Sequence, residues 1–377
     1  MGQPGAAELL FLQSLPGLEE VLAEEAGRLG RVRRVSGGIE LEGGPGLHAD
    51  AALSLRIAER VLLRLAKGPV RRWREVEALL ASAELDGVAR AGQPLALEVA
   101  AVRVPEAPGR DTLLARLSQL WRRPVQSARG AADLGGPGTR LVLRVADGEA
   151  SVSAEVGGSL LHRRGWRQEP SRAPMRETLA AGVLSLAGYR SDRPLWDPMC
   201  GSGTLVIEAA LAARRVAPGL GRTFAAEGWP SAAAVDWSGR RDRLRSAVLP
   251  QVPAPVLGSD LNAGALGTAR RNARRAGVTA DVRLERLDVS KATPGALGAG
   301  LLVANLPYGR RVGGPRHELE VFDTSVAATI GRTFAGWRRA LLVDDPARLQ
   351  RAGGREPDTI HRLANGGIPV FLGIWKA

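Results

Sequence analysis

The chain has 377 residues, of which 45% are hydrophobic and 24% are charged, a composition typical of a soluble globular protein. We find neither an apolar run long enough to cross a membrane nor a signal peptide, which argues against a membrane or secreted protein. The single cysteine, Cys200, excludes an internal disulfide, and no Cys/His cluster has metal-ligand spacing. We therefore expect a cytoplasmic protein without a metal.

The charge of the chain is strongly positive. Lysine and arginine number 52 against 39 aspartates and glutamates, which gives a net charge of +13. Such an excess favours a polyanionic partner, and we expect this partner to be nucleic acid. An anionic membrane surface is the weaker alternative, because we find no basic amphipathic helix with an aromatic face.

Residues 1–68 have the pattern of a small α+β module. A helix is expected after Pro16, because proline stands near its start, acids occupy its first turns and Gly30 marks its end. The module is completed by a strand at 8–15, a hairpin at 31–42 and a second helix at 51–66.

Residues 69–157 form a second predicted α+β module, with helices at 71–82 and 111–123, a strand at 94–103 and two strands within 139–156. Its many arginines are either solvated helix faces or a surface that contacts phosphates. Trp73 and Trp121 stand beside arginine pairs, and we expect them to pack helices rather than to stack on bases. The candidate RNA-contacting residues of this module are Arg71, Arg72, Arg122 and Arg123.

A linker and a leading helix at 158–188 precede residues 189–377, in which strands and helices alternate. This alternation predicts a doubly wound, Rossmann-like α/β sheet. An apparent hairpin, turning at Asn365-Gly366-Gly367, follows the last parallel strand. An antiparallel hairpin at the edge of a parallel sheet is typical of class I methyltransferases.

The stretch DPMCGSGT, residues 197–204, leaves the first strand of this sheet and enters a helix at Thr204. Gly201 and Gly203 allow a tight turn and a close approach to a ligand, although the full dinucleotide spacing is absent. Asp197 would repel a pyrophosphate but could hold the amino group of an amino-acid tail. This combination favours S-adenosylmethionine, and a plain strand–helix turn with a capping aspartate is the alternative.

Two further acids follow later strands. Asp260 ends the second strand, where it could accept both ribose hydroxyls or cap the next helix. Asp288 ends the third strand and could accept from the adenine amino group, or could be a surface acid. Asp260 follows the glycine turn at an unusually long distance, which we attribute to an insertion at 216–255.

The fourth strand ends in NLPYGRR, residues 305–311. The Asn305 side-chain oxygen and the Leu306 carbonyl could both accept from an exocyclic amino group and orient it. Pro307 would stiffen the segment and Tyr308 could stack on the target base, whereas a type I turn is the alternative. Two arginines then follow that could contact flanking phosphates, Arg310 and Arg311.

The segments DPMCGSGTLVIEAAL, PGLGRTFAAEGWP, GSD and NLPYG resemble the THUMP-domain class I RNA methyltransferases, which methylate guanine N2 in ribosomal or transfer RNA. SLPGLEEVLAEE resembles their N-terminal ferredoxin-like segment, and 69–157 stands where their THUMP domain lies. Two departures are Leu306, where many members have a second proline, and Arg310, where the rRNA enzymes often have an acid.

The resemblance implies a role for each motif. The acceptor guanine would be received by Asn305, Leu306, Pro307 and Tyr308. S-adenosylmethionine would be bound by Asp197, Gly201, Gly203, Thr204, Asp260, Asp288 and Asn305. The expected function is therefore guanine-N2 methylation of large-subunit rRNA or tRNA. Adenine-N6 methylation of RNA and noncatalytic RNA binding are the alternatives.

Overall fold

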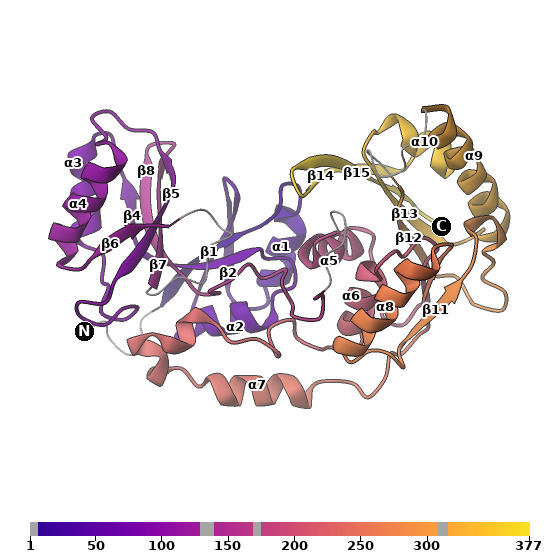
Figure 1. Ribbon diagram of the computed structural model, residues 1–377, viewed down its shortest axis with the longest axis horizontal. Helices are drawn as coiled ribbons and strands as arrows, with labels where there is room; N and C mark the ends of the chain where they lie inside the picture. The colour runs from indigo at the N-terminus through magenta and orange to yellow at the C-terminus, as the bar shows by residue number, and fades with distance from the viewer. Residues whose placement is uncertain (1–6, 129–138, 169–174, 308–315) are drawn as a thin grey trace. The chain divides into compact units, whose positions relative to one another are not determined.

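The computed structural model describes residues 7–128, 139–168, 175–307 and 316–377 (Figure 1). The chain folds into two compact units, neither of which is continuous in sequence. The first unit contains 1–14, 22–161 and 221–243, and the second contains 15–21, 162–220 and 244–377.

The described residues of the first unit form one sheet of eight strands in the order β2-β3-β1-β4-β8-β7-β5-β6. Neighbouring strands are antiparallel except for β5, which runs parallel to both β6 and β7. The strands are β1 Glu8–Gln13, β2 Arg31–Val35, β3 Gly38–Gly43, β4 Arg60–Pro69, β5 Leu95–Val102, β6 Val125–Ser127, β7 Thr139–Ala146 and β8 Glu149–Glu155.

The predicted helix at 51–66 is wrong. Helix α2, Leu47–Ser54, ends early, and the carboxylate of Glu25 accepts from the next backbone N–H groups, those of Arg56 (2.8 Å) and Ile57 (3.1 Å). The chain then continues as β4, which pairs with β1 on one side and β8 on the other. The apolar run suits a central strand as well as a helix, and pairing with two neighbours decides between them.

Strand β4 also crosses the predicted module boundary at residue 68. Both predicted modules therefore contribute strands to one continuous sheet. The predicted helices of this half are present as α1 Glu19–Ala26, α3 Trp73–Ala81 and α4 Arg110–Trp121. Trp73 and Trp121 are buried, which confirms their predicted packing role, and the Trp121 Nε1 donates to the Leu80 carbonyl at 2.9 Å.

Residues 221–243 belong to the first unit, although the surrounding chain belongs to the second. This segment contains the 3₁₀ helices η1 Ala225–Gly228 and η2 Pro230–Ala234 and the start of helix α7 Trp237–Ser246. The rings of Trp229 and Trp237 each lie 5.8 Å from the buried His48 ring, whose Nδ1 lies 2.9 Å from a Glu8 carboxylate oxygen. Aromatic packing around this buried His48–Glu8 contact thus holds the segment in this unit.

The second unit is built on a sheet of seven strands, among the described residues, in the order β11-β10-β9-β12-β13-β15-β14. Strands β9 to β13 are parallel, and β15 pairs antiparallel with β13 and β14, which confirms the predicted sheet and its C-terminal hairpin. The strands are β9 Leu195–Asp197, β10 Val256–Asp260, β11 Val282–Arg286, β12 Leu301–Asn305, β13 Arg338–Val343, β14 Thr359–Asn365 and β15 Ile368–Trp375.

Helices pack on this sheet as its alternating pattern predicts (Figure 1). Helix α6 packs on β9 and β10, α8 on β10 and β11, and α10 on β13 and α9. A core that includes Leu302, Phe334 and Trp375 fills the space near α9 and α10. The helices are α5 Glu177–Leu186, α6 Thr204–Ala213, α8 Ala263–Arg275, α9 Arg316–Thr333, α10 Ala347–Gly353 and the short 3₁₀ helix η3 Val289–Lys291.

Candidate functional site

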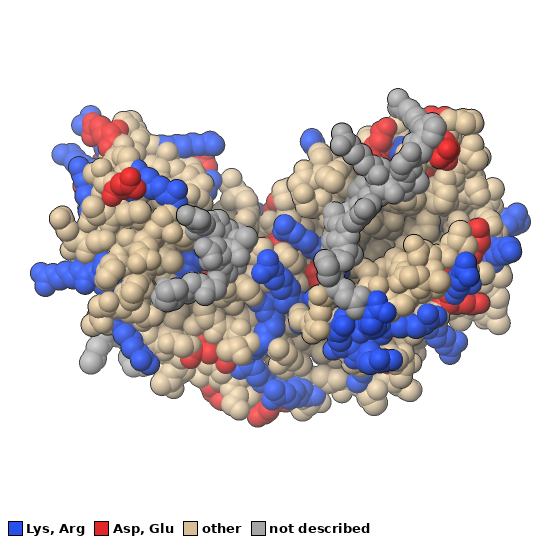
Figure 2. Space-filling view, in the orientation of Figure 1, with Lys and Arg blue, Asp and Glu red and all other residues tan. Residues whose placement is uncertain are grey.

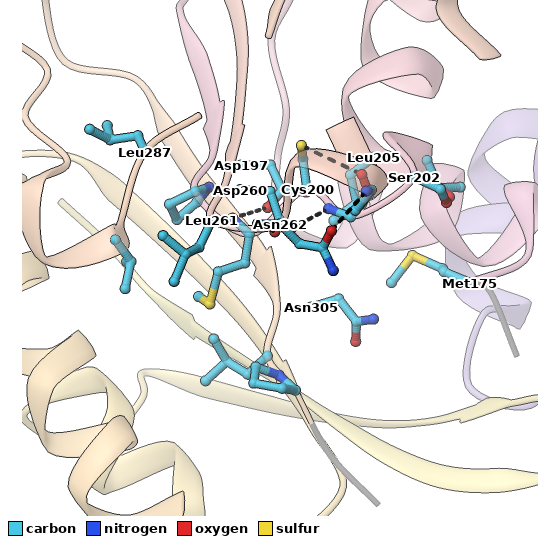
Figure 3. A pocket seen from close by; sticks show the side chains of 18 of the residues that line it. Met175, Asp197, Cys200, Ser202, Leu205, Asp260, Leu261, Asn262, Leu287 and Asn305 are labelled. Carbon is cyan, nitrogen blue, oxygen red and sulfur yellow. Dashed lines mark hydrogen bonds between the residues drawn. The ribbon is translucent and has the colours of Figure 1, made fainter. Parts of the chain in front are cut away.

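A pocket of about 640 Å³ lies at the carboxyl ends of the parallel strands of the second unit (Figure 3). Parallel strands bring their carboxyl ends to one edge, so polar residues at successive strand ends meet there. Four such residues line the pocket: Asp197 from β9, Asp260 from β10, Asp288 from the loop after β11 and Asn305 from β12. The other predicted residues that line it are Gly201, Thr204, Leu306 and Pro307.

The glycine turn has the left-handed backbone that its sequence predicts. Gly201 has φ 54° and Gly203 has φ 86°, conformations that residues with a side chain rarely adopt. Gly203 is not among the described residues that line the pocket, and its predicted contact with a cofactor stays a prediction. A Cβ at Gly203 would lie 3.1 Å from the Ala269 Cβ, so this glycine allows α6 and α8 to approach each other.

Asp197 is a buried acid at the base of the turn, with 2% of its surface exposed. Its Oδ1 accepts from the Met199 backbone N–H at 3.0 Å. Burial raises the pKa of Asp197 to about 8, and the nearby Asp260 carboxylate adds to this shift, while the Met199 hydrogen bond opposes it. A cation placed against this carboxyl would favour its ionised form.

A cationic amino group at Asp197 should therefore release a proton when it binds. Near pH 6.5 the free carboxyl, with its pKa of about 8, is mostly protonated. We expect it to ionise when a cation binds against it. We expect S-adenosylhomocysteine to release a proton from Asp197 at this pH and to bind more tightly as the pH rises toward 8. Calorimetry in buffers of different ionisation enthalpy measures this release. Asp197→Asn should abolish it, and equal release by that variant would contradict the assignment.

Asp260 fixes the glycine turn. Its Oδ2 accepts from the Gly201 N–H at 2.9 Å, and its Oδ1 accepts from the Asn262 N–H at 2.8 Å. The alternative that Asp260 caps the next helix is wrong, because the N-cap of α8 is Asn262, which accepts from the N–H groups of Gly264 and Ala265. Each Asp260 oxygen retains a second lone pair for a hydroxyl donor.

Asp288 stands at the N-terminus of η3. Its Oδ1 accepts from the Ser290 N–H at 2.8 Å, and this hydrogen bond lowers the pKa of the Asp288 carboxyl. The carboxylate is thus an ionised acceptor beside the apolar lining residues Leu287, Val289 and Phe322. None of these three was predicted from the sequence, because the apolar residues Leu287 and Val289 after a strand, and Phe322 on helix α9, cannot be told from core residues by their pattern.

Cys200 is packed under the turn, as predicted. Its side chain is buried, and a Cβ at Gly258 would lie 3.1 Å from the Cys200 Sγ. Burial raises the pKa of the Cys200 thiol, which keeps it protonated at neutral pH. Its position and protonation make a nucleophilic role unfavourable.

The acceptor motif begins with the buried side-chain oxygen of Asn305. Asn305 ends β12, and its Oδ1 is buried without a hydrogen-bond partner among the described residues. An unsatisfied buried acceptor costs about 1–3 kcal/mol, so a ligand that donates a hydrogen bond here would recover this cost. In Figure 3, Asn305 and Asn262 are directed toward the same space.

The backbone after Asn305 is held on both sides. The Leu306 N–H donates to the Leu342 carbonyl at 3.0 Å, and the Leu306 side chain is buried. The Pro307 carbonyl accepts from the Arg348 Nη1 at 3.1 Å. Tyr308, Arg310 and Arg311, predicted to contact RNA, lie outside the described residues.

Arg348 is a supporting residue that the sequence analysis missed. Its side chain is 5% exposed, and it makes two hydrogen bonds to Asp323, at 2.9 and 2.8 Å, and one to Asp344, at 2.9 Å. The Asp323 side chain is fully buried. Because Arg348 lies on α10, this network ties the acceptor motif to α9 and α10.

The arginines predicted to contact RNA in the first unit differ in exposure. Arg71, Arg72 and Arg122 are exposed. Arg123 is buried, donates to the Ala89 carbonyl at 2.9 Å and forms an ion pair with Asp86, so its predicted RNA contact is corrected to a structural role. In Figure 2 basic side chains occupy several separate groups on the visible face.

Two features are absent from the described residues. No helix in the described parts of the chain is long and apolar enough to cross a membrane. Among the same residues, no group of three or more histidine, cysteine, aspartate or glutamate side chains is placed to hold a metal ion.

Comparison with solved structures confirms the fold class. The crystal structure of SMU.472, a putative methyltransferase complexed with SAH, matches with a TM-score of 0.83 at 24% identity over 98% of each chain. TrmN from Thermus thermophilus matches with a TM-score of 0.67 at 20% identity, over 98% of this chain and 100% of that one. At these identities the likeness is one of fold.

Sequence relatives are more similar. The chain is 33% identical to the ribosomal RNA large subunit methyltransferase K/L of Syntrophotalea carbinolica, over 97% of this chain and 53% of the relative. It is 32% identical to the protein of that name from Allochromatium vinosum, over 96% of this chain and 51% of the relative. The chain therefore spans about half the length of these curated relatives.

Family comparison assigns both ends of the chain. The RlmL ferredoxin-like domain matches residues 9–62, which agrees with the predicted N-terminal ferredoxin-like segment. The RMKL-like methyltransferase domain matches residues 164–369, more than half of the chain, and includes every strand of the seven-stranded sheet in whole or in part. The chain thus belongs to the family of the RMKL-like methyltransferase domain.

Proposed function

We propose that the chain transfers a methyl group from S-adenosylmethionine to the N2 amino group of a guanosine in large-subunit rRNA or tRNA. The observation that carries this proposal is the buried Asn305 Oδ1, which has no hydrogen-bond partner in the described parts of the chain and lies in one pocket with Asp197, Asp260 and Asp288. Kinship to proteins named as rRNA large subunit methyltransferases supports an RNA substrate.

The pocket residues fit the proposed cofactor. Asp197 would hold the amino group of its methionine part, Asp260 the ribose hydroxyls and Asp288 the adenine amino group. The apolar residues Leu287 and Val289 would lie against the flat adenine ring. When bound, S-adenosylmethionine supplies an electrophilic methyl group on a positively charged sulfur.

The acceptor motif would prepare the amino nitrogen. A guanine N2 lone pair is delocalised into the ring and is therefore a poor nucleophile. The guanine amino group has two N–H groups, and Asn305 Oδ1 and the Leu306 carbonyl can each accept a hydrogen bond from one of them. These hydrogen bonds orient the nitrogen and draw it toward tetrahedral geometry. Because β13 and Arg348 hold the backbone of residues 306 and 307, these acceptors are positioned before the substrate arrives.

The remaining half of the chain would bind the RNA. We assign this role to the THUMP-like region at 69–157 and to exposed arginines such as Arg71, Arg72 and Arg122. The domain division of the sequence analysis, at residues 68, 157 and 188, stays a prediction. A cytoplasmic location, where such RNA is processed, also stays a prediction.

Nucleoside mass spectrometry of a strain that lacks the gene tests the proposal. Transfer RNA and large-subunit rRNA are digested separately, and N2-methylguanosine should disappear from one of them. Wild-type protein should restore the nucleoside, whereas Asn305→Ala should not. Unchanged N2-methylguanosine would overturn the proposal, and loss of N6-methyladenosine instead would identify adenine as the acceptor.

A further inference from the structure

A second pocket of the second unit, with a volume of about 430 Å³, is strongly basic. None of its lining residues was among the sites predicted from the sequence. Its four arginines outnumber the two nearby glutamates, Glu177 and Glu208, so the pocket has an excess of positive charge. We call it the basic pocket; it is lined by His162, Arg163, Arg164, Gly165, Arg167, Arg176 and Glu177.

Two of these arginines are largely enclosed by the protein and form ion pairs with glutamates. The Arg164 Nε lies 3.6 Å from Glu208, and the Arg167 Nε lies 3.5 Å from Glu177. The side chains of Arg164 and Arg167 are 4% and 13% exposed. Burial lowers the pKa of Arg167 because the carboxylates offset the loss of solvation only in part. These two arginines and two glutamates balance in charge, so the excess positive charge of the pocket comes from Arg163 and Arg176.

The rim of the basic pocket offers an accessible cation. Arg163 is exposed and makes no hydrogen bond or ion pair with any residue that the structure describes. Arg176 is half-buried at the N-terminus of α5. Arginine forms two parallel hydrogen bonds with phosphate oxygens, which makes such a rim well suited to a phosphodiester.

Arg167 links the basic pocket to the candidate active site. Its Nη1 donates to the Met175 carbonyl at 2.9 Å, and its Nη2 donates to the Thr204 Oγ1 at 2.7 Å. Both Met175 and Thr204 line the first pocket. The two pockets thus share this wall, and the exposed Arg163 lies on the side of it away from the first pocket.

We propose that the basic pocket binds a backbone phosphate of the RNA whose guanine enters the first pocket. The inference rests on the proposed function, to which it adds a site for the substrate backbone. The phosphate contacts Arg163 at the rim and is attracted by the excess positive charge of the pocket. Such a contact fixes the register of the RNA and carries no base specificity.

Charge reversal at Arg163 tests this site in the full-length chain. Binding of a fluorescein-labelled RNA hairpin with guanines in its loop is followed by anisotropy between about 50 and 200 mM salt. We expect Arg163→Glu to weaken binding about tenfold and to reduce the salt slope by about one, because one phosphate contact is lost. Arg163→Lys should retain most of the affinity.

The matched control is Arg190→Glu, which makes the same charge change at an exposed arginine of the same unit that pairs with Asp192. Equal RNA affinities for Arg163→Glu and this control would overturn the inference. Weaker binding of S-adenosylhomocysteine by Arg163→Glu, with RNA binding unchanged, would also overturn it and would assign the pocket to the cofactor carboxylate.

Failure of the proposed function is distinguishable in the same experiment. If the wild-type protein methylates no guanine but Arg163→Glu still loses RNA affinity, the phosphate site in the basic pocket is supported and the proposed reaction is refuted. If the wild-type protein methylates guanine while Arg163→Glu binds the hairpin with the same affinity as Arg190→Glu, the proposed reaction is supported and the phosphate site is refuted.

Discussion

Replacing Asn305 with alanine is expected to lower the turnover number by about 10²- to 10³-fold, the loss typical of a group that stabilises a transition state directly. The variant removes the buried Oδ1, which has no partner among the described residues, and so breaks no hydrogen bond of the described protein. Stability should therefore change little. Single-turnover assays with radiolabelled S-adenosylmethionine measure the loss, and calorimetry measures cofactor affinity.

The affinity measurement separates the two predicted roles of Asn305. Binding of S-adenosylhomocysteine within about threefold of wild type would assign the residue to the acceptor base alone, since a lost hydrogen bond to the cofactor would cost about tenfold. Asn262→Ala is the matched control, because this pocket asparagine caps α8, and its loss should cost about 1 kcal/mol of stability while turnover persists. Wild-type turnover by Asn305→Ala would refute the proposed acceptor role.

Replacing Arg348 with methionine is expected to lower the free energy of unfolding by about 3–5 kcal/mol, because the fully buried Asp323 carboxylate loses its partner. The same change frees the Pro307 carbonyl, so turnover should fall in the protein that remains folded. Urea unfolding measures the first effect. Turnover at saturating cofactor, corrected for the folded fraction, measures the second.

A double variant separates the two effects of Arg348. Arg348→Met combined with Asp323→Asn leaves no unpaired charge in this pair, so most of the stability should return. Turnover should stay low, because the Pro307 carbonyl is still released. Arg214→Met, which breaks the Arg214–Asp281 pair elsewhere in the same unit, should cost stability without lowering turnover. Recovery of turnover in the double variant would show that Arg348 acts on stability alone.

The sheet of the second unit could be predicted because its signals are local. Strands such as β9 and β12 are short apolar runs that end in a polar residue, and glycine or proline punctuates many of the following turns. The helix predicted at 51–66 failed for the opposite reason. Its apolar residues fit either a helix or a strand. Pairing with β1 and β8, which are distant in sequence, makes residues 60–69 form strand β4.

The candidate site also contains residues with a local sequence signal and residues placed only by long-range contacts. Asp197, Asp260, Asp288 and Asn305 were identified because strand ends of a parallel sheet converge, as they do in the pocket. Arg348 lies far along the chain from Pro307, and no sequence pattern marks their contact. The burial of Arg123 was equally inaccessible, since a net charge does not distinguish solvated arginines from those that bind backbone carbonyls.

The division of the chain into discontinuous units restricts how the protein can be cut or recombined. The backbone passes from one unit to the other after residues 14, 21, 161, 220 and 243. A fragment that ends at 161 would lack Trp229 and Trp237, which cover His48. A fragment that begins at 162 would lack Leu18, against which Gly182 packs. Cutting the chain once, between residues 161 and 162, would therefore leave each fragment without side chains that pack in its core.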